Sequence, residues 1–186
     1  FLEQFAGTVS VTGTGTLAFA GNLSTTLGAG VVNFAADGTI TSASGKHILA
    51  TNGITTSTTV TGNLRMLGGA QTVTGQVGTA ALVLKEVSGG VAAGVTTFAN
   101  DIFANTVSVT GTGTMVFNGN VTGTIAGTSS INFIGDGGIT IADNKNITVS
   151  GGITNTGAAN SIQGNILAIG TSTISGQVGT STLAIN

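Results

Sequence analysis

The chain has 186 residues, of which only 5% are charged, and its formal net charge at pH 7 is −2. Four basic residues are too few to neutralise a phosphate backbone, so the composition excludes nucleic acid as a partner. With no cysteine, the chain forms no disulfide framework and no thiolate metal site. No apolar run approaches the roughly 18 residues of a membrane-spanning helix, so no transmembrane segment is expected.

Short apolar runs separated by glycine follow one another along the chain. From Val9 onward, apolar and hydroxyl side chains alternate with a period of two, as in a half-buried strand. The alternation returns at residues 17–19, 31–34 and 39–41. β-Branched residues favour such extended segments, and glycine and asparagine supply the turns between them. No apolar period of 3.6 residues persists over a helical length, so the sequence predicts an all-β fold.

The second half of the chain repeats the first. Residues 8–19 read TVSVTGTGTLAF and residues 106–117 read TVSVTGTGTMVF, an offset of 98 residues (106 minus 8). Later pairs return in the same order, such as Asp37-Gly38 as Asp136-Gly137. We therefore expect two tandem sequence repeats of about 98 residues. Repeat unit 1 covers residues 1–98, and repeat unit 2, incomplete at its C-terminal end, covers residues 99–186. We expect the two units to form one continuous solenoid.

Two all-β architectures fit such a repeat. In a β-solenoid, or parallel β-helix, each coil adds a layer of short parallel strands. The alternative is a pair of antiparallel β-sandwich repeats, which would have longer strands and a core richer in aromatic residues. Aromatic residues make up only 4% of this chain, and the runs are short, so the sequence favours the solenoid. At about 20 residues a coil, the chain would make about nine layers.

The apolar residues that recur in both copies are expected to point inward. The predicted structural core consists of Val9, Val11, Leu17, Phe19, Phe34, Ile40, Ile54, Val107, Val109, Phe117, Phe133, Ile139 and Ile153.

Residues 8–22, TVSVTGTGTLAFAGN, resemble the passenger regions of bacterial autotransporters, and more narrowly the large repetitive outer-membrane surface antigens of rickettsial type. The shared pattern is Gly-Thr/Ser-Gly-x-Leu-x-x-x-Gly, which stands at residues 13–21 and returns, with methionine in place of leucine, at residues 111–119. The resemblance implies a right-handed parallel β-helix on a cell surface, with a role in adhesion or as a protective layer.

No set of residues in the sequence indicates catalysis. The only histidine, His47, corresponds to Asn146 in the second copy, so we expect an exposed turn residue without a role that the copies share. Acid–base catalysis needs two converging carboxylates, whereas the six acidic residues are scattered. Asp37 is expected to stabilise a turn rather than to bind calcium, which takes several carboxylates close in sequence. We expect no enzyme activity and no cofactor or metal site.

Three asparagines lie in Asn-x-Ser/Thr sequons and are candidate glycosylation sites: Asn22, Asn120 and Asn146. Such sequons also arise by chance in a threonine-rich chain. The predicted function is a non-catalytic, extracellular structural or adhesive segment of a cell-surface repeat protein. The alternative is a self-assembling subunit of an extracellular filament, sheath or surface layer. The expected partners are copies of the chain itself or neighbouring repeats, and host or neighbouring cell-surface molecules.

Overall fold

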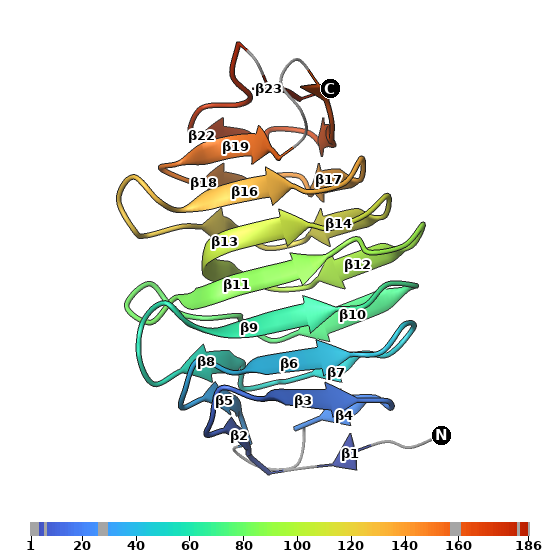
Figure 1. The fold of residues 1–186 in the computed structure, drawn as a ribbon, viewed down its shortest axis with the longest axis vertical. Helices are drawn as coiled ribbons and strands as arrows, with labels where there is room; N and C mark the ends of the chain where they lie inside the picture. Colours follow the sequence, from blue (N-terminus) through green and yellow to red (C-terminus); the bar gives the residue numbers. More distant parts are fainter. Residues whose placement is uncertain (1–3, 6, 26–29, 157–160, 182, 186) are drawn as a thin grey trace.

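The structure is a computed structural model that describes residues 4–5, 7–25, 30–156, 161–181 and 183–185. Its strands stack in one column from the N-terminal end to the C-terminal end (Figure 1). Every strand ladder in these residues is parallel, and none of these residues forms a helix. The fold is therefore an all-β β-solenoid, as the sequence predicts, and the antiparallel sandwich alternative is wrong.

Each coil contributes strands to three faces, which we number in the order in which the chain visits them. The first face is a sheet of eight strands. They are β1 (Gln4–Phe5), β4 (Leu23–Ser24), β7 (Ile48–Leu49), β10 (Gln71–Thr74), β12 (Val95–Phe98), β14 (Thr114–Phe117), β17 (Gly138–Ile141) and β21 (Asn165–Ala168).

The second face follows the first along every coil, and Val77 joins its lower and upper strands through isolated bridges. Its strands are β2 (Val9–Val11), β5 (Val32–Phe34), β8 (Ile54–Thr56), the beginning of β13 (Ile102–Val109), β15 (Val121–Thr122), β18 (Asn146–Thr148) and β22 (Thr173–Ser175).

The third face completes the coil. Its strands are β3 (Thr16–Phe19), β6 (Thr39–Ser42), β9 (Thr61–Met66), β11 (Leu84–Gly89), the end of β13, β16 (Ser130–Phe133) and β19 (Gly152–Asn155). The strand β13 turns the corner between two faces, because Ile102 pairs with β15 whereas Thr106 pairs with β11 and β16. Near the C-terminal end, β20 (Ser161–Ile162) pairs with β23 (Leu183–Ala184).

The solenoid makes about seven turns rather than the nine expected from the sequence. The residues Val9, Val32, Ile54, Val77 and Ile102 stand one above another on the second face. Their spacing gives 22 to 25 residues a coil, more than the 20 assumed. At about 4.8 Å between stacked strands, seven steps give a column roughly 34 Å long.

The sequence repeat does not equal a whole number of coils. Val9 lies on the second face, and Ile102 lies four coils above it on the same face. Val107, the counterpart of Val9, lies on the same strand as Ile102 but past the corner, on the third face. Two equivalent ladders show the shift: Val9, Val32 and Ile54 on the second face, and Val107, Ile131 and Ile153 on the third. The repeat therefore advances the chain by four turns and one face, so equivalent residues point from different sides of the column. Ladders also pass through the sequence boundary between the two units, since β12 pairs with both β10 and β14.

Inward-facing apolar side chains fill the column. The structure buries these expected core residues: Val11, Phe19, Phe34, Ile40, Ile54, Val107, Val109, Phe117, Phe133, Ile139 and Ile153. Val9 is partly buried and packs against this core. On the first face, the rings of Phe98 and Phe117 are neighbours in successive coils, with centroids 6.1 Å apart.

The prediction for Leu17 is wrong, because this side chain is 38% exposed. Leu17 lies on β3, which has the β6 ladder above it and no strand ladder below it among the described residues. Its counterpart Met115 lies between Thr96 and Ile139 of the adjoining coils and is fully buried. Burial at this position therefore depends on a coil on each side and not only on an inward-facing strand.

Candidate functional site

The polar side chains gather at the corners of the solenoid, where they connect one coil to the next. At the corner before the first face, Oδ1 of Asn22 accepts a hydrogen bond from the backbone N–H of His47, at 2.9 Å. In the coil above, Nδ1 of His47 accepts the N–H of Thr72, at 3.0 Å. Each side chain thus satisfies a backbone donor one coil later in the chain.

The second copy builds the same ladder at a different corner, before the second face. There Asp101 accepts the N–H of Asn120 at 2.8 Å, Asn120 accepts that of Asn146 at 3.0 Å, and Asn146 accepts that of Thr173 at 3.3 Å. This displacement follows from the repeat length of four turns and one face. The ladder is therefore a property of the repeat rather than of one side of the molecule.

His47 shares a role with its counterpart, so the prediction of an exposed residue without a shared role is wrong. His47 is partly buried, and its Nδ1 takes the place of the Oδ1 of Asn146 as an acceptor. Both an unprotonated imidazole nitrogen and an amide oxygen can accept a backbone N–H. This corner position requires a side-chain acceptor that can contact the backbone N–H of the coil above, and both histidine and asparagine supply one.

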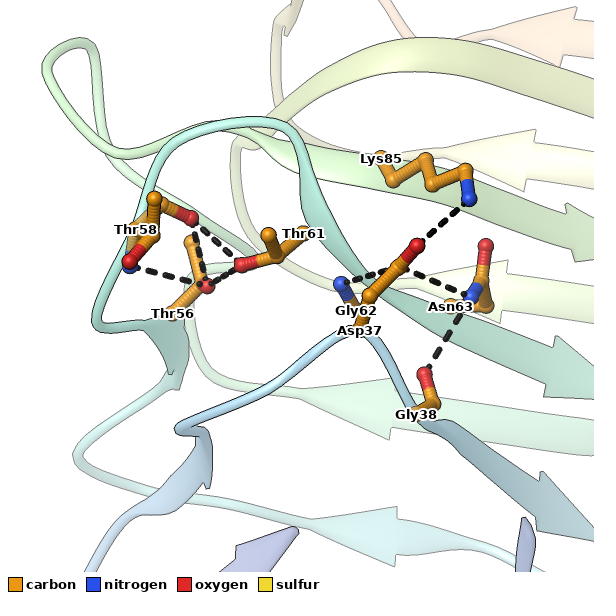
Figure 2. A network of polar contacts seen from close by, with 8 residues as sticks. All are labelled: Asp37, Gly38, Thr56, Thr58, Thr61, Gly62, Asn63 and Lys85. Carbon is orange, nitrogen blue, oxygen red and sulfur yellow. Dashed lines mark hydrogen bonds and ion pairs between the residues drawn. The ribbon is translucent and has the colours of Figure 1, made fainter. Parts of the chain in front are cut away.

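A cluster around Asp37 joins three successive coils, as Figure 2 shows. Oδ1 of Asp37 accepts the N–H of Gly62 at 3.3 Å and the side-chain amide of Asn63 at 3.4 Å, and that amide also donates to the carbonyl of Gly38 at 3.2 Å. Oδ2 of Asp37 forms an ion pair with Nζ of Lys85, at 2.6 Å. Asp37 is thus a hydrogen-bonding turn residue, as the sequence predicts.

The ion pair of Asp37 and Lys85 is the only one among the described residues, and both side chains are partly exposed. The hydrogen bond from Lys85 holds the pKa of Asp37 below its ordinary value of 3.8, against the opposing effect of burial. At this exposure, such a pair contributes at most about 1 kcal/mol. The counterpart Asp136 keeps the bond to the coil above, accepting the N–H of Gly164 at 3.2 Å.

Hydroxyl groups form a second polar cluster beside Asp37 (Figure 2). The hydroxyls of Thr56 and Thr61 lie 2.5 Å apart, and both also bond the carbonyl of Thr58. Thr56 donates in addition to the carbonyl of Phe34, at 3.1 Å. These hydroxyls fix the turn that leads into β9, in which Val60 has a positive φ of 59°. A nucleophilic hydroxyl needs an adjacent base, and the bonds here go to hydroxyls and carbonyls instead.

A surface hollow of about 520 Å³ lies at the corner between the first and second faces. Its lining is neutral and includes the amides of Asn52, Gln76 and Asn100. All three amides already bond the backbone. Asn52 donates to the carbonyl of Gly30 at 3.1 Å, Asn100 accepts the N–H of Gly75 at 3.0 Å, and Gln76 donates to the carbonyl of Gly78 at 2.8 Å. The hollow therefore offers neutral hydrogen-bonding groups and no acid–base pair.

Three further aspartates within the described ranges lie at corners of the solenoid, whereas Glu86 lies on strand β11. Asp101, Asp136 and Asp143 each accept a backbone N–H from the coil above. Glu3 lies outside the described residues. Within the described ranges, no three histidine, aspartate or glutamate residues cluster closely enough to hold a metal ion.

The three sequon asparagines differ in exposure. Asn22 and Asn120 are partly buried with their amide oxygens bonded to the coil above, and the amide nitrogen of Asn120 also donates to Asp101 at 3.3 Å. Asn146 and Thr148 are exposed. All three amide oxygens accept a hydrogen bond from the coil above, so Asn146 differs from Asn22 and Asn120 in its exposure alone. Asn146 is therefore the most accessible of the three candidates, and glycosylation stays a prediction.

The chain matches no protein-family model, no curated protein and no solved structure. In the ranges that the structure describes, no helix is long and apolar enough to span a membrane.

The sequence contains a signal for the corner ladder that the sequence analysis does not use. A residue with a side-chain acceptor stands directly before an inward apolar residue at the spacing of one coil, in Asn22-Leu23, His47-Ile48, Asn120-Val121 and Asn146-Ile147. Periodicity in the polar residues would therefore have located these corners, in the same way that apolar periodicity located the strands.

Proposed function

We propose that this chain is a non-catalytic structural or adhesive segment of an extracellular cell-surface repeat protein. The observation that carries the proposal is that its few charged and amide side chains form hydrogen bonds between neighbouring coils. Carboxylates and amides that could form a reactive site instead bond backbone groups of the neighbouring coil, as in Asp37, Asp101, Asp136, Asn22 and Asn120. Such bonds resist separation of the coils, which suits a stiff spacer.

The repeat geometry supports the same function. Because a repeat of four turns and one face places the second copy of a surface feature on a different side, the rod presents similar chemistry on two of its sides. A binding site on one face would gain nothing from repetition at this period, whereas a spacer or a protective layer needs no preferred side. The resemblance of residues 8–22 to autotransporter passengers supports the cell-surface location.

The alternative function, a self-assembling subunit, is favoured by one observation. Apolar side chains that are buried in one copy are exposed in the terminal coils, since Val77 is 1% exposed and its counterpart Val178 is 48% exposed. Terminal coils of solenoids pair with further strands unless they are capped.

The test of the proposed function is the location of the protein in its native cells. Antibodies raised against the folded chain should label intact cells, and protease added to intact cells should remove that label. Labelling that appears only after the cells are permeabilised would contradict the proposal. A substrate turned over by the purified chain would contradict its non-catalytic part.

A further inference from the structure

Three amide side chains form a row along the corner between the first and second faces. Asn52, Gln76 and Asn100 follow one another at steps of 24 residues (76 minus 52, and 100 minus 76), one in each of three successive coils. All three line the surface hollow of about 520 Å³. Strand ladders continue below and above these coils, so the hollow lies along the side of the column and is not produced by a chain end.

Hydrogen bonds to the backbone fix the orientation of two of these amides. The N–H of Gly75 can only donate, so the atom of Asn100 that lies 3.0 Å from it is the amide oxygen. The carbonyl of Gly78 can only accept, so the atom of Gln76 that lies 2.8 Å from it is the amide nitrogen. Within the described residues, Nδ2 of Asn100 and Oε1 of Gln76 have no further partner. The lining therefore holds one donor and one acceptor in fixed positions.

The chemistry of this lining favours a neutral ligand that is rich in hydroxyl groups. A hydroxyl both donates and accepts, so a pair of neighbouring hydroxyls complements a fixed donor beside a fixed acceptor. Thr51 and Thr74 add hydroxyl groups of their own to the lining. None of the described lining residues is charged, so a charged ligand would lose water without gaining an ion pair. Sugars meet both requirements.

An aromatic side chain stands beside the hollow. Of the phenylalanine side chains that the structure describes, Phe103 alone is not buried. Its N–H donates to the carbonyl of Val77 at 2.7 Å, and a Cβ on Gly78, which lines the hollow, would lie 3.2 Å from the Cβ of Phe103. Ile102 is buried, so the alternation along β13 points Phe103 outward. A sugar ring has an apolar C–H face that packs on such a ring.

The spacing of the row sets the length of the ligand. Stacked coils are about 4.8 Å apart, so the three amides span about 10 Å. One pyranose unit advances a sugar chain by a length close to one coil, so successive sugars would meet successive amides. The volume of about 520 Å³ also falls within the range of about 300–1,000 Å³ that is usual for ligand pockets.

We infer that this hollow binds a neutral oligosaccharide of about two to three sugar units, which lies along the column across the coils of Asn52, Gln76 and Asn100. The inference rests on the proposed adhesive role and deepens it, because it names the class of molecule to which the segment adheres. The second copy does not repeat the row, since Asn52 corresponds to Gly151. The site therefore belongs to the first copy alone.

The test records the side-chain amide signals of the ¹⁵N-labelled chain by NMR. Maltotriose, cellotriose, mannotriose and triacetylchitotriose are added separately, each up to about 10 mM, which reveals affinities in the millimolar range. At least one of them should shift the signals of Gln76 and Asn100 and leave those of Asn22 and Asn120, in the corner ladders, in place. Trigalacturonic acid, a charged trisaccharide, should bind at least about tenfold more weakly.

Asn100→Asp removes the donor without removing the bond that holds the side chain. A carboxylate oxygen still accepts the N–H of Gly75, so the melting temperature should be unchanged, whereas the affinity for the sugar should fall about tenfold or more. The matched control is Asn22→Asp, which keeps an acceptor for the N–H of His47 outside the hollow. This control should bind the sugar as the unchanged chain does.

Two further variants test the rest of the lining. Thr51 is an exposed turn residue, so Thr51→Glu should leave the fold intact and abolish binding by placing a charge in the hollow. Phe103→Leu keeps an apolar side chain at the outward position and should weaken binding about threefold or more, because the sugar loses its aromatic contact.

Amide signals that stay in place with every neutral sugar would overturn the inference, and so would binding that Asn100→Asp and Thr51→Glu leave unchanged. Equally tight binding of trigalacturonic acid would overturn the neutral ligand class. These outcomes are separate from the test of the proposed function. A chain that binds no sugar but is labelled on intact cells loses this site and keeps its location. A chain that binds sugar but is labelled only after permeabilisation keeps this site and loses the location.

Discussion

Replacing Gly62 by alanine tests the packing between a corner and the core. Gly62 has a φ of +84°, and a Cβ there would lie 2.3 Å from Cγ of the fully buried Phe34. Non-bonded carbons approach to about 3.5–4.0 Å, so the ring would have to move by about 1 Å in a close-packed interior. Overpacking costs about 1–3 kcal/mol and the left-handed backbone about 1–2 kcal/mol more. We expect Gly62→Ala to lower the free energy of unfolding by about 2–5 kcal/mol.

Two matched substitutions separate these contributions. Gly45 has a φ of +68° but open space around its Cβ position, so Gly45→Ala should cost only the backbone strain of about 1–2 kcal/mol. Gly15 has open space and no positive φ, so Gly15→Ala should stay within about 0.5 kcal/mol of the unchanged chain. Gly164 repeats the Gly62 environment, with a φ of +84° and Phe133 at 2.3 Å.

The assay is urea unfolding followed by far-UV circular dichroism, with the midpoint shifts converted through a common slope. The double variant Gly62→Ala/Phe34→Leu should lose less than the sum of the single variants, because a smaller side chain removes the clash. A loss for Gly62→Ala no larger than that for Gly45→Ala would refute the reasoning, since the ring contact would then contribute nothing.

Three further predictions concern the corners. His47→Asn should change the free energy of unfolding by less than about 0.5 kcal/mol, because Asn146 is the acceptor at the equivalent position of the second copy. His47→Ala should cost about 1 kcal/mol, because the N–H of Thr72 loses its acceptor. Thermal melts measure both changes, and equal costs for the two variants would contradict the ladder. Since Lys85 lowers the pKa of Asp37 in the folded state, this group stabilises the fold above its unfolded value near 3.8 and loses that effect as the pH falls through the lower folded value. The unfolding midpoint of the unchanged chain should therefore fall more steeply over that acidic window than that of Lys85→Met, by at most about 1 kcal/mol, and parallel curves would contradict the ion pair. Val60→Asn should raise stability by about 1 kcal/mol because asparagine tolerates the observed φ of 59° better than a β-branched side chain does; a lower melting temperature would count against that conformation.

Local chemistry in the sequence determined the fold class and most of the core. The alternation around Val9 and Val11 indicates a strand with one buried side, and the glycines between the runs disfavour a helix. The internal repetition then identified Phe34, Ile40 and Phe133 as inward residues. These positions stay apolar in both copies, although many of the residues around them differ between the copies. The fold class and the inward residues depend on side chains that are close together along the chain, so they can be predicted from the sequence.

Tertiary structure alone decided what depends on the neighbouring coil. The sequences around Leu17 and Met115 are almost the same, yet among the described residues only Met115 has a strand ladder on each side, and it is buried. The role of His47 emerged only when its Nδ1 was placed against the N–H of Thr72, 25 residues away. The rotation of one face per repeat also required the stacking register, because a repeat length in residues does not state how many residues complete a turn. Contacts between coils are long-range contacts, and their geometry is set by the coil length at each level rather than by any short stretch of residues.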